Sequence, residues 1–265
     1  KKHKIFNVLI ASASLTSSAG IHSKFSNHLD QQIKAKGSFT GLLPCVYHEC
    51  YSCDWPADHR FPMRKFKDLY EFMLENRIIT DRNIFIPKEL DDEVFLNTHC
   101  ENYYHNFINK KLSNEISRRI GFPSPHSNEL IKRTKMEVSG TFLTGQLAVK
   151  FGLACNLAGG THHAHRNFGS GFTILNDLSV ASRALKEMYG LNKICIIDAD
   201  VHQGDGTAST LSDETSIHTT SFHCSENFPF RKSASDCDVS FESGTTDSEF
   251  QPVFESTVLN VLETE

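Results

Sequence analysis

The sequence predicts an α/β protein built around a mainly parallel sheet. The 265-residue chain alternates short apolar runs with longer segments whose apolar residues recur at helical spacing, a pattern typical of parallel strands joined by helices. The run at 193–197 is apolar at nearly every position and is followed directly by acidic residues, as expected for a strand buried on both faces. With 39% hydrophobic residues, the chain can form one sizeable core.

Each element is predicted from its periodicity and from the residues that stop it. Strands are expected at 42–48, 193–197 and 216–222, and helices at 62–75, 140–157, from Asn176 or Asp177 to Tyr189, and at 248–263. Glycines after the second and third of these helices are expected to end them. No internal repeat or long linker divides the chain, so a single domain is expected over 41–265.

The first forty residues are expected to form a separate tail or targeting segment. Residues 1–29 contain no Asp or Glu and hold six serines, a composition typical of an organelle transit peptide; the start of the segment also resembles a secretory signal. An extended tail outside the core is the alternative. Without targeting, the cytoplasm or the nucleus is the expected compartment, because eight cysteines in a chain of this length fit a reducing environment.

Charge and hydropathy exclude two classes of partner. The formal net charge is -5, which provides no basic surface for direct nucleic-acid binding. No stretch is long and apolar enough to cross a membrane, so we expect neither nucleic acid nor membrane as a direct partner.

Two polar segments indicate metal-assisted hydrolysis. The first is GGTHHAH at 159–165, and the second is DADVHQGDG at 198–206. Asp200 and His202 lie two residues apart, so in extended backbone they point to the same side, at the carboxyl end of a strand where α/β sheets bind ligands. A metal held there can polarise a carbonyl and activate water, while a neighbouring imidazole moves protons.

Asp198 and Asp205 are suited to a different purpose, as acceptors for the ring N–H groups of histidines whose other nitrogen faces the substrate. Such carboxylates fix the tautomer and the orientation of an imidazole. We therefore predict two Asp–His dyads beside one metal, with the pairing left open. A lone His-His pair is more often a solvated loop, and Asp-Gly pairs are mostly turn formers; the combination in one chain favours the functional interpretation.

These segments resemble the signature blocks of the zinc-dependent histone deacetylase family. The matching blocks are 159–172, Asn176-Asp177 and 196–207, together with 59–65, 118–123, 226–232 and 235–236. Two of them, 118–123 and 226–232, resemble the class IV branch and its bacterial relatives. The resemblance covers approximately residues 43–265 and implies a three-layer α/β/α fold with a central, mainly parallel sheet of the arginase/deacetylase type.

The resemblance also implies roles for individual residues. His163 would be the general base and His162 its partner, which stabilises the oxyanion or protonates the leaving amine; Asp198 and Asp205 would orient them. Zinc would be bound by Asp200 and His202. The remaining implied positions are the walls of a narrow acyl-lysine tube at Gly171, Phe172 and Phe228, the arginine of an internal acetate channel at Arg60, and a potassium site near Asp198, Ser221 and Phe222.

Three features depart from the family pattern. The family's third zinc ligand, an Asp, and its transition-state tyrosine would lie beyond Glu265, so we expect the chain to be a fragment of a longer protein; a truncated form with little activity is the alternative. Gln203 stands where many members have histidine, and we expect little consequence for mechanism. His165 is an additional histidine that we expect to face solvent.

The leading functional hypothesis is zinc-dependent hydrolysis of the amide bond of acyl-lysine in histones or other proteins. On this hypothesis the chain regulates chromatin and has corepressor-type protein partners. One alternative is hydrolysis of small acetylated amines, and another is a shortened, non-catalytic interaction protein. Arginase-like hydrolases are disfavoured, because their metal-binding run carries further carboxylates in place of the His-His pair.

Overall fold

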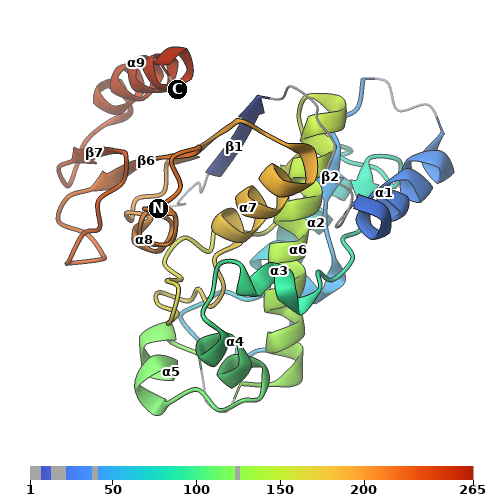
Figure 1. Cartoon of the computed structure of the whole chain (residues 1–265), viewed down its shortest axis with the longest axis horizontal. Helices are drawn as coiled ribbons and strands as arrows, with labels where there is room; N and C mark the ends of the chain where they lie inside the picture. Colours follow the sequence, from blue (N-terminus) through green and yellow to red (C-terminus); the bar gives the residue numbers. More distant parts are fainter. Residues whose placement is uncertain (1–6, 13–21, 38–40, 123–125, 265) are drawn as a thin grey trace.

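The computed structural model describes residues 7–12, 22–37, 41–122 and 126–264. In these residues the chain has an α/β fold in which parallel strands are flanked by helices, in agreement with the predicted three-layer α/β/α architecture. Figure 1 shows α9, β6 and β7 at one end of the molecule and α1 at the other, with the long helix α6 between them.

The strands form two hydrogen-bonded groups. The first has the order β1 (Asn7–Ser12), β5 (Lys193–Asp198), β6 (Ile217–Cys224) and β7 (Cys237–Phe241), and the second has the order β3 (Ile84–Phe85), β2 (Cys45–Val46) and β4 (Cys155–Asn156). Among the described pairings, only β1 with β5 is antiparallel. The predicted strands at 193–197 and 216–222 are confirmed, whereas the strand predicted at 42–48 is reduced to Cys45–Val46.

Helices connect and cover the strands. They are α1 (His22–Lys36), the short 3-10 turn η1 (Glu49–Tyr51), α2 (Lys65–Glu75), α3 (Asp92–Leu96), α4 (Glu101–Ile108), α5 (Asn114–Ile120), α6 (Asn128–Phe151), α7 (Asp177–Tyr189), α8 (Asp205–Leu211) and α9 (Asp247–Thr264). The predicted α7 is confirmed with its caps, because the Asn176 side chain accepts from the Ser179 amide and Gly190 follows in the left-handed conformation. The small helices α3 to α5 were not predicted.

Helix α6 differs most from its prediction. It was expected at 140–157, but it begins after Ser127, whose side chain caps the Leu130 amide, and it ends at Phe151. Gly152 follows with φ +86° and stops the helix. The chain then returns as β4, which carries Cys155 and leads directly into the first polar segment.

The main core lies where α6 packs on α7. Close approach of these helices depends on Gly145, because a Cβ there would collide with the Leu185 side chain. Part of the N-terminal segment also joins the core. Phe25 and Leu29 of α1 are buried at 5% and 4% exposure, and the Phe25 ring lies 5.7 Å from that of Phe142.

The expectation of a tail outside the core is therefore wrong for α1. The expected targeting segment at 1–29 falls partly on residues 1–6 and 13–21, which lie outside the described residues. None of the helices in the described part of the chain combines the length and apolar character needed to cross a bilayer.

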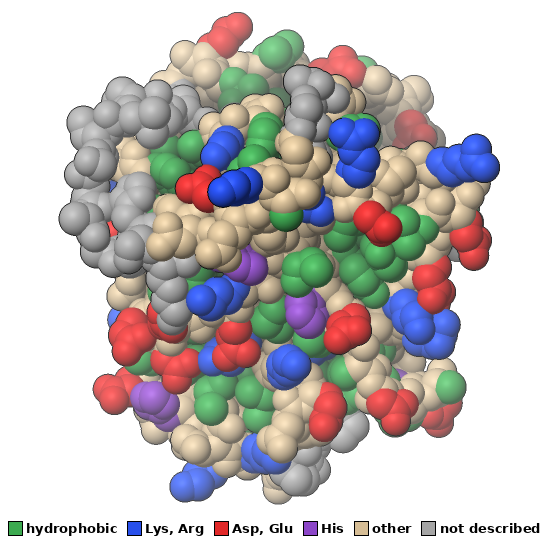
Figure 2. Space-filling model, turned by 90° about the vertical axis from the view of Figure 1, so that its right-hand side faces the viewer, with side chains coloured by type: hydrophobic (Ala, Val, Ile, Leu, Met, Phe, Trp, Pro, Cys, Tyr) green, Lys and Arg blue, Asp and Glu red, His purple; other side chains and the backbone are tan. Residues whose placement is uncertain are grey.

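Charges of both signs are interspersed on the face of the molecule drawn in Figure 2, where Lys and Arg lie beside Asp and Glu. The described residues of that face show no continuous basic surface. Phosphate backbones are recognised by such surfaces; the expectation that the chain does not bind nucleic acid directly stays a prediction.

Candidate active site

The first polar segment forms a loop between β4 and α7 that is held by one carboxylate. Asp177, 1% exposed, accepts hydrogen bonds from the Thr141 hydroxyl (2.6 Å), from the Gly160 amide (3.0 Å), and from the Thr161 amide and hydroxyl (both 2.7 Å). A Cβ at Gly159 would lie 2.6 Å from an Asp177 oxygen, so only glycine allows this approach. Asp177 thus fixes the backbone immediately before the two histidines. From the sequence, Asp177 was only a possible first residue of α7 and part of a block that resembles the family.

The two predicted Asp–His dyads are both present, and the structure determines their pairing. His162 Nδ1 lies 2.6 Å from Asp198 Oδ2, and His163 Nδ1 lies 2.7 Å from Asp205 Oδ1. All four side chains are at least nine-tenths buried. Asp198 ends β5, while Asp205 begins α8. In each pair the ring nitrogen that faces the carboxylate is the donor, which leaves Nε2 directed away from it.

The dyads differ in charge state. Burial disfavours the imidazolium form of His162, but the charge and the hydrogen bond of Asp198, helped by Asp200 and Asp205, outweigh burial and raise the His162 pKa to about 9. Burial and the neighbouring His162 charge lower the His163 pKa to about 4, against the opposing effect of Asp205. At neutral pH, His162 is therefore a proton donor and His163 a proton acceptor.

Asp200 and His202 lie beside the dyads. Asp200 Oδ1 is 2.9 Å from His202 Nδ1 and 3.9 Å from His162 Nε2. It also accepts the His202 amide at 2.8 Å. The Asp200 side chain is 8% exposed and that of His202 38% exposed. The two predicted metal ligands thus lie together next to His162, and His202 is the more exposed of the two.

Their chemistry fits zinc, which binds imidazole nitrogen and carboxylate oxygen. Within the described residues, however, no group of three or more His, Cys, Asp or Glu side chains is placed to hold a metal ion. A catalytic zinc site normally uses three protein ligands. The pair supplies part of such a site and not all of it.

Gly171 and Phe228 lie against the His163 dyad, and their role as walls of a tube stays a prediction. The Phe228 ring is 4.8 Å from the His163 ring at an interplanar angle of 84°. Gly171 has φ +55°, and a Cβ there would lie 2.7 Å from His163 Cδ2 and 3.2 Å from the Phe228 ring. The absence of a side chain at Gly171 therefore keeps the space beside the His163 imidazole free.

Phe172 and Arg60 belong to the neighbouring aromatic cluster. The Phe172 ring lies 5.5 Å from Phe61 and 5.7 Å from Phe122. The Arg60 guanidinium lies 5.8 Å from the Phe172 ring, on an exposed residue. The placement of Arg60 in an acetate channel stays a prediction.

Lys65 is an inward-lying cation that sequence reasoning missed. Its ammonium lies 4.7 Å from the Phe61 ring and 4.9 Å from the Phe66 ring. Burial lowers the Lys65 pKa, with Glu137 acting in the opposite direction. The block at 59–65 contains three cations, and the sequence does not show that Lys65 is the one beside these rings.

The residues expected at a potassium site are neighbours across two strands. Ser221 of β6 is the register partner of Asp198 in β5. Its hydroxyl accepts the Gly204 amide at 3.4 Å and lies 3.1 Å from His223 Nδ1. The side chain of Phe222 is buried against Phe254 of α9 at 4.9 Å between ring centroids, so only its backbone carbonyl is suited to a cation.

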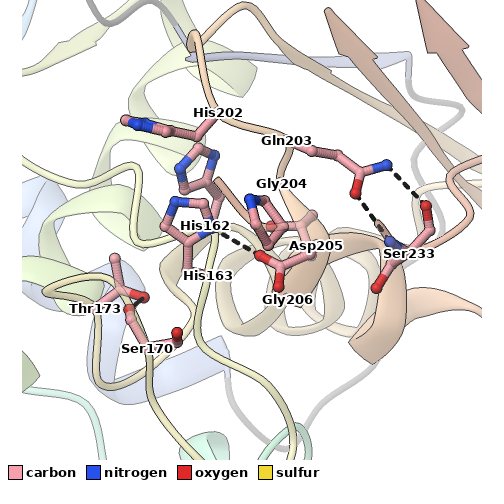
Figure 3. A network of polar contacts seen from close by, with 12 residues as sticks. His162, His163, Ser170, Thr173, His202, Gln203, Gly204, Asp205, Gly206 and Ser233 are labelled. Carbon is pink, nitrogen blue, oxygen red and sulfur yellow. Dashed lines mark hydrogen bonds and ion pairs between the residues drawn. The ribbon is translucent and has the colours of Figure 1, made fainter. Parts of the chain in front are cut away.

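Gln203 makes contacts that its position in the sequence did not indicate. Its amide nitrogen donates to the Ser233 carbonyl at 2.7 Å, and its amide oxygen accepts from the Ser233 backbone N–H at 2.9 Å (Figure 3). The same nitrogen donates to Asp238 at 2.7 Å. Gln203 thereby ties the loop of Asp200 and His202 to the segment that carries Phe228, a bidentate link that a histidine cannot make.

The expectation for His165 is also wrong. Its side chain is only 13% exposed, and its Nε2 lies 3.0 Å from Asp205 Oδ2. The bend between the Thr161 turn and Phe168 directs this ring inward, which spacing along the sequence does not show.

The sequence of the chain is similar to those of known proteins. The sequence model of the histone deacetylase domain matches residues 59–264. An uncharacterized protein from a Picosynechococcus species is 43% identical over 206 residues, covering 77% of this chain and 68% of the relative. Histone deacetylase 2 of Arabidopsis thaliana is 29% identical over 203 residues, covering 72% and 51% of the two chains. The acetoin utilization protein AcuC of Staphylococcus aureus is 26% identical over 224 residues, covering 77% and 57%.

Solved structures show the same fold. The crystal structure of an HDAC homolog from Aquifex aeolicus superimposes with a TM-score of 0.72 at 20% identity, covering 84% of this chain and 65% of that one. An HDAC homolog complexed with SAHA gives a TM-score of 0.70 at 18% identity, with the same coverage. The chain thus spans from about half to two thirds of the length of these proteins. Assignment to the class IV branch stays a prediction. By sequence and by fold, the chain belongs to the histone deacetylase family of hydrolases.

Proposed function

We propose that this site hydrolyses the amide bond of acyl-lysine side chains with the help of zinc. The observation that carries the proposal is the pair of buried Asp–His dyads directly beside Asp200 and His202. The dyads provide a donor and an acceptor of protons, which amide hydrolysis needs for the leaving amine and for the attacking water. Asp200 Oδ1 and His202 Nδ1 would hold the zinc, which would act as a Lewis acid toward the amide carbonyl.

The chain's own residues supply the proton transfers. His163, neutral at pH 7 and held through Nδ1 by Asp205, offers the Nε2 lone pair as general base. His162, held protonated by Asp198, offers an acidic N–H to the developing oxyanion or to the leaving amine. Fixed orientation by the two carboxylates avoids reorganisation during the reaction.

The walls of the site suit an extended apolar stem that ends in an amide. Phe228 presents an aromatic surface beside His163, and Gly171 leaves room opposite it. Flat aromatic surfaces pack well on methylene groups. A lysine side chain has such a stem, so the site favours acyl-lysine. A potassium ion at Asp198, Ser221 and the Phe222 carbonyl, and protein substrates with corepressor-type partners, remain part of this proposal.

The test is hydrolysis of three substrates by the purified chain supplied with zinc: an acetyl-lysine peptide, a long-acyl-lysine peptide and an acetylated polyamine. Turnover of a lysine peptide that stops on addition of a chelator is expected. Turnover of the polyamine alone would overturn the lysine assignment in favour of a small-amine hydrolase. If a folded, zinc-binding chain turns over none of these substrates, the same assay is made on a longer form of the protein: turnover there would place essential groups outside this chain, and no turnover there would favour the non-catalytic interaction protein.

A further inference from the structure

Asp205 accepts a hydrogen bond on each of its carboxylate oxygens, and both donors are imidazoles. Oδ1 lies 2.7 Å from His163 Nδ1, and Oδ2 lies 3.0 Å from His165 Nε2. Burial opposes ionisation of Asp205, but the two histidine hydrogen bonds outweigh it and hold the carboxyl pKa below its ordinary value. Because an ionised carboxylate only accepts hydrogen bonds, each of these ring nitrogens carries the proton.

The His165 ring is held in place on its flat face. It stacks on Phe168 with 4.3 Å between ring centroids and 24° between planes. The Arg119 guanidinium lies 3.9 Å from the centroid of the same Phe168 ring. A cation at this distance from an aromatic ring is attracted to its π system, so the stack limits the movement of Phe168 and, with it, of His165.

The backbone of His165 is fixed as well. Its amide donates to the Phe168 carbonyl at 2.9 Å, and its carbonyl accepts from His99 Nδ1 at 3.0 Å. His99 is fully buried, and its other nitrogen accepts the Asn176 amide at 2.9 Å. The position of His165 is therefore determined by three parts of the chain: α7, the loop after the catalytic turn, and the segment before α4.

A carboxylate held at one oxygen only retains freedom to rotate about its Cβ–Cγ bond and leaves its second oxygen without a donor. In a buried site an unpaired acceptor is costly, and any rotation of Asp205 would turn the His163 ring with it. The hydrogen bond from His165 removes this freedom. Groups that orient a reacting side chain in this way commonly affect the rate by about tenfold or more.

We propose that His165 is a positioning residue for the reaction: through Asp205 it fixes the orientation of the His163 imidazole. The inference rests on the proposed function, in which His163 is the general base. His165 itself touches neither substrate nor metal ligand, so its effect is expected on the chemical step and not on substrate binding.

The test compares His165→Leu with His165→Gln in the full chain supplied with zinc. The Gln side chain keeps a neutral N–H donor at about the reach of the imidazole Nε2, and Leu keeps the bulk without the donor. For His165→Leu we expect kcat to fall about tenfold with KM changed less than about twofold. His165→Gln should recover most of the loss. His105→Leu, at an exposed histidine of α4, is the matched control and should behave as the unaltered chain.

A second readout works without turnover. The His163 Nδ1 proton, hydrogen-bonded to a buried carboxylate, should give a slowly exchanging NMR signal in the metal-free chain. Broadening or loss of this signal in His165→Leu, and its retention in His165→Gln, would support the coupling even if the unaltered chain were inactive. Failure of the proposed function and failure of this inference are thereby distinguishable.

The proposal is overturned if His165→Leu keeps both the kcat and the His163 signal of the unaltered chain, or if only KM changes. Thermal unfolding of each variant is measured in parallel. If His165→Leu does not fold, Phe168→Leu decides, because it removes the stacked ring and leaves the donor in place. We expect that variant to lose about threefold in kcat and to broaden the same signal; an unchanged kcat and signal would equally overturn the proposal.

Discussion

The dyads and the metal ligands lie side by side, yet they are organised differently. In the dyads, each histidine is held by a carboxylate at 2.6–2.7 Å within a buried network that reaches α7 and α8. Asp200 and His202 instead hydrogen-bond to each other, and His202 is 38% exposed. The described residues thus hold both proposed proton-transfer groups in place, whereas the proposed metal ligands form a pair that would require further ligands.

The largest expected effect comes from breaking a dyad. Replacement of His163 by Ala removes the general base, so kcat should fall about 10³-fold. Zinc affinity, measured by calorimetry, should stay within about threefold, because His163 is not a proposed ligand. The matched control is His105→Ala on α4. Unaltered turnover in His163→Ala would remove this residue from the mechanism.

Asp200→Ala removes one of the two proposed zinc ligands. We expect zinc affinity to fall at least about 100-fold, since loss of a direct ligand should exceed the effect of removing an orienting partner. The His163 Nδ1–H signal should persist, because Asp205 and His165 remain. Loss of that signal together with zinc binding would show that the two halves of the site are not independent.

Low pH should reduce the stability of the fold around the dyads, because His99 becomes protonated. Burial lowers its pKa to about 4, below the value of 6.5 in the unfolded chain. Between pH 6.5 and pH 4 the unfolded state therefore binds a proton that the folded state does not, so the free energy of unfolding falls as pH falls through this window. The decrease has an upper limit of about 3 kcal/mol.

Protonation of His99 would also break a hydrogen bond. His99 Nε2 accepts a hydrogen bond from the Asn176 amide at 2.9 Å, and a protonated nitrogen cannot accept one. Urea unfolding from pH 7 to pH 4.5 measures the effect. His99→Gln should have a lower stability at pH 7 and a smaller dependence on pH. Identical pH dependence in the two proteins would refute the role of His99.

The smallest effect concerns the link between the two loops. Gln203→Leu removes the bidentate contact with Ser233. Phe228 would then be held less firmly, so KM should rise severalfold. The free energy of unfolding should fall by about 1–2 kcal/mol. Gln251→Leu, on the surface of α9 where Gln251 contacts Glu255, is the matched control. Equal behaviour of the two variants would return Gln203 to the minor role that its sequence position suggested.

Short sequence features predicted the strand and the helix that position the site. The apolar run before Asp198 predicted β5, and the capping residue Asn176 and Gly190 predicted the bounds of α7. The start of α6 was missed because its first half is rich in charged residues and its buried positions are recognisable only from their packing. The short helices α3 to α5 have too few turns for a periodic pattern to be detected.

The sequence by itself determined the family, the order of the main elements and the identity of the four dyad residues, because these depend on residue type and on spacing along the chain. Only the tertiary structure decided which carboxylate holds which histidine, that Asp177 fixes the catalytic turn, that the Lys65 ammonium lies beside the rings of Phe61 and Phe66, and that His165 reaches Asp205. Each of these contacts joins segments 16 or more residues apart or depends on the direction of a turn. Such relations arise from packing, which a one-dimensional pattern does not contain.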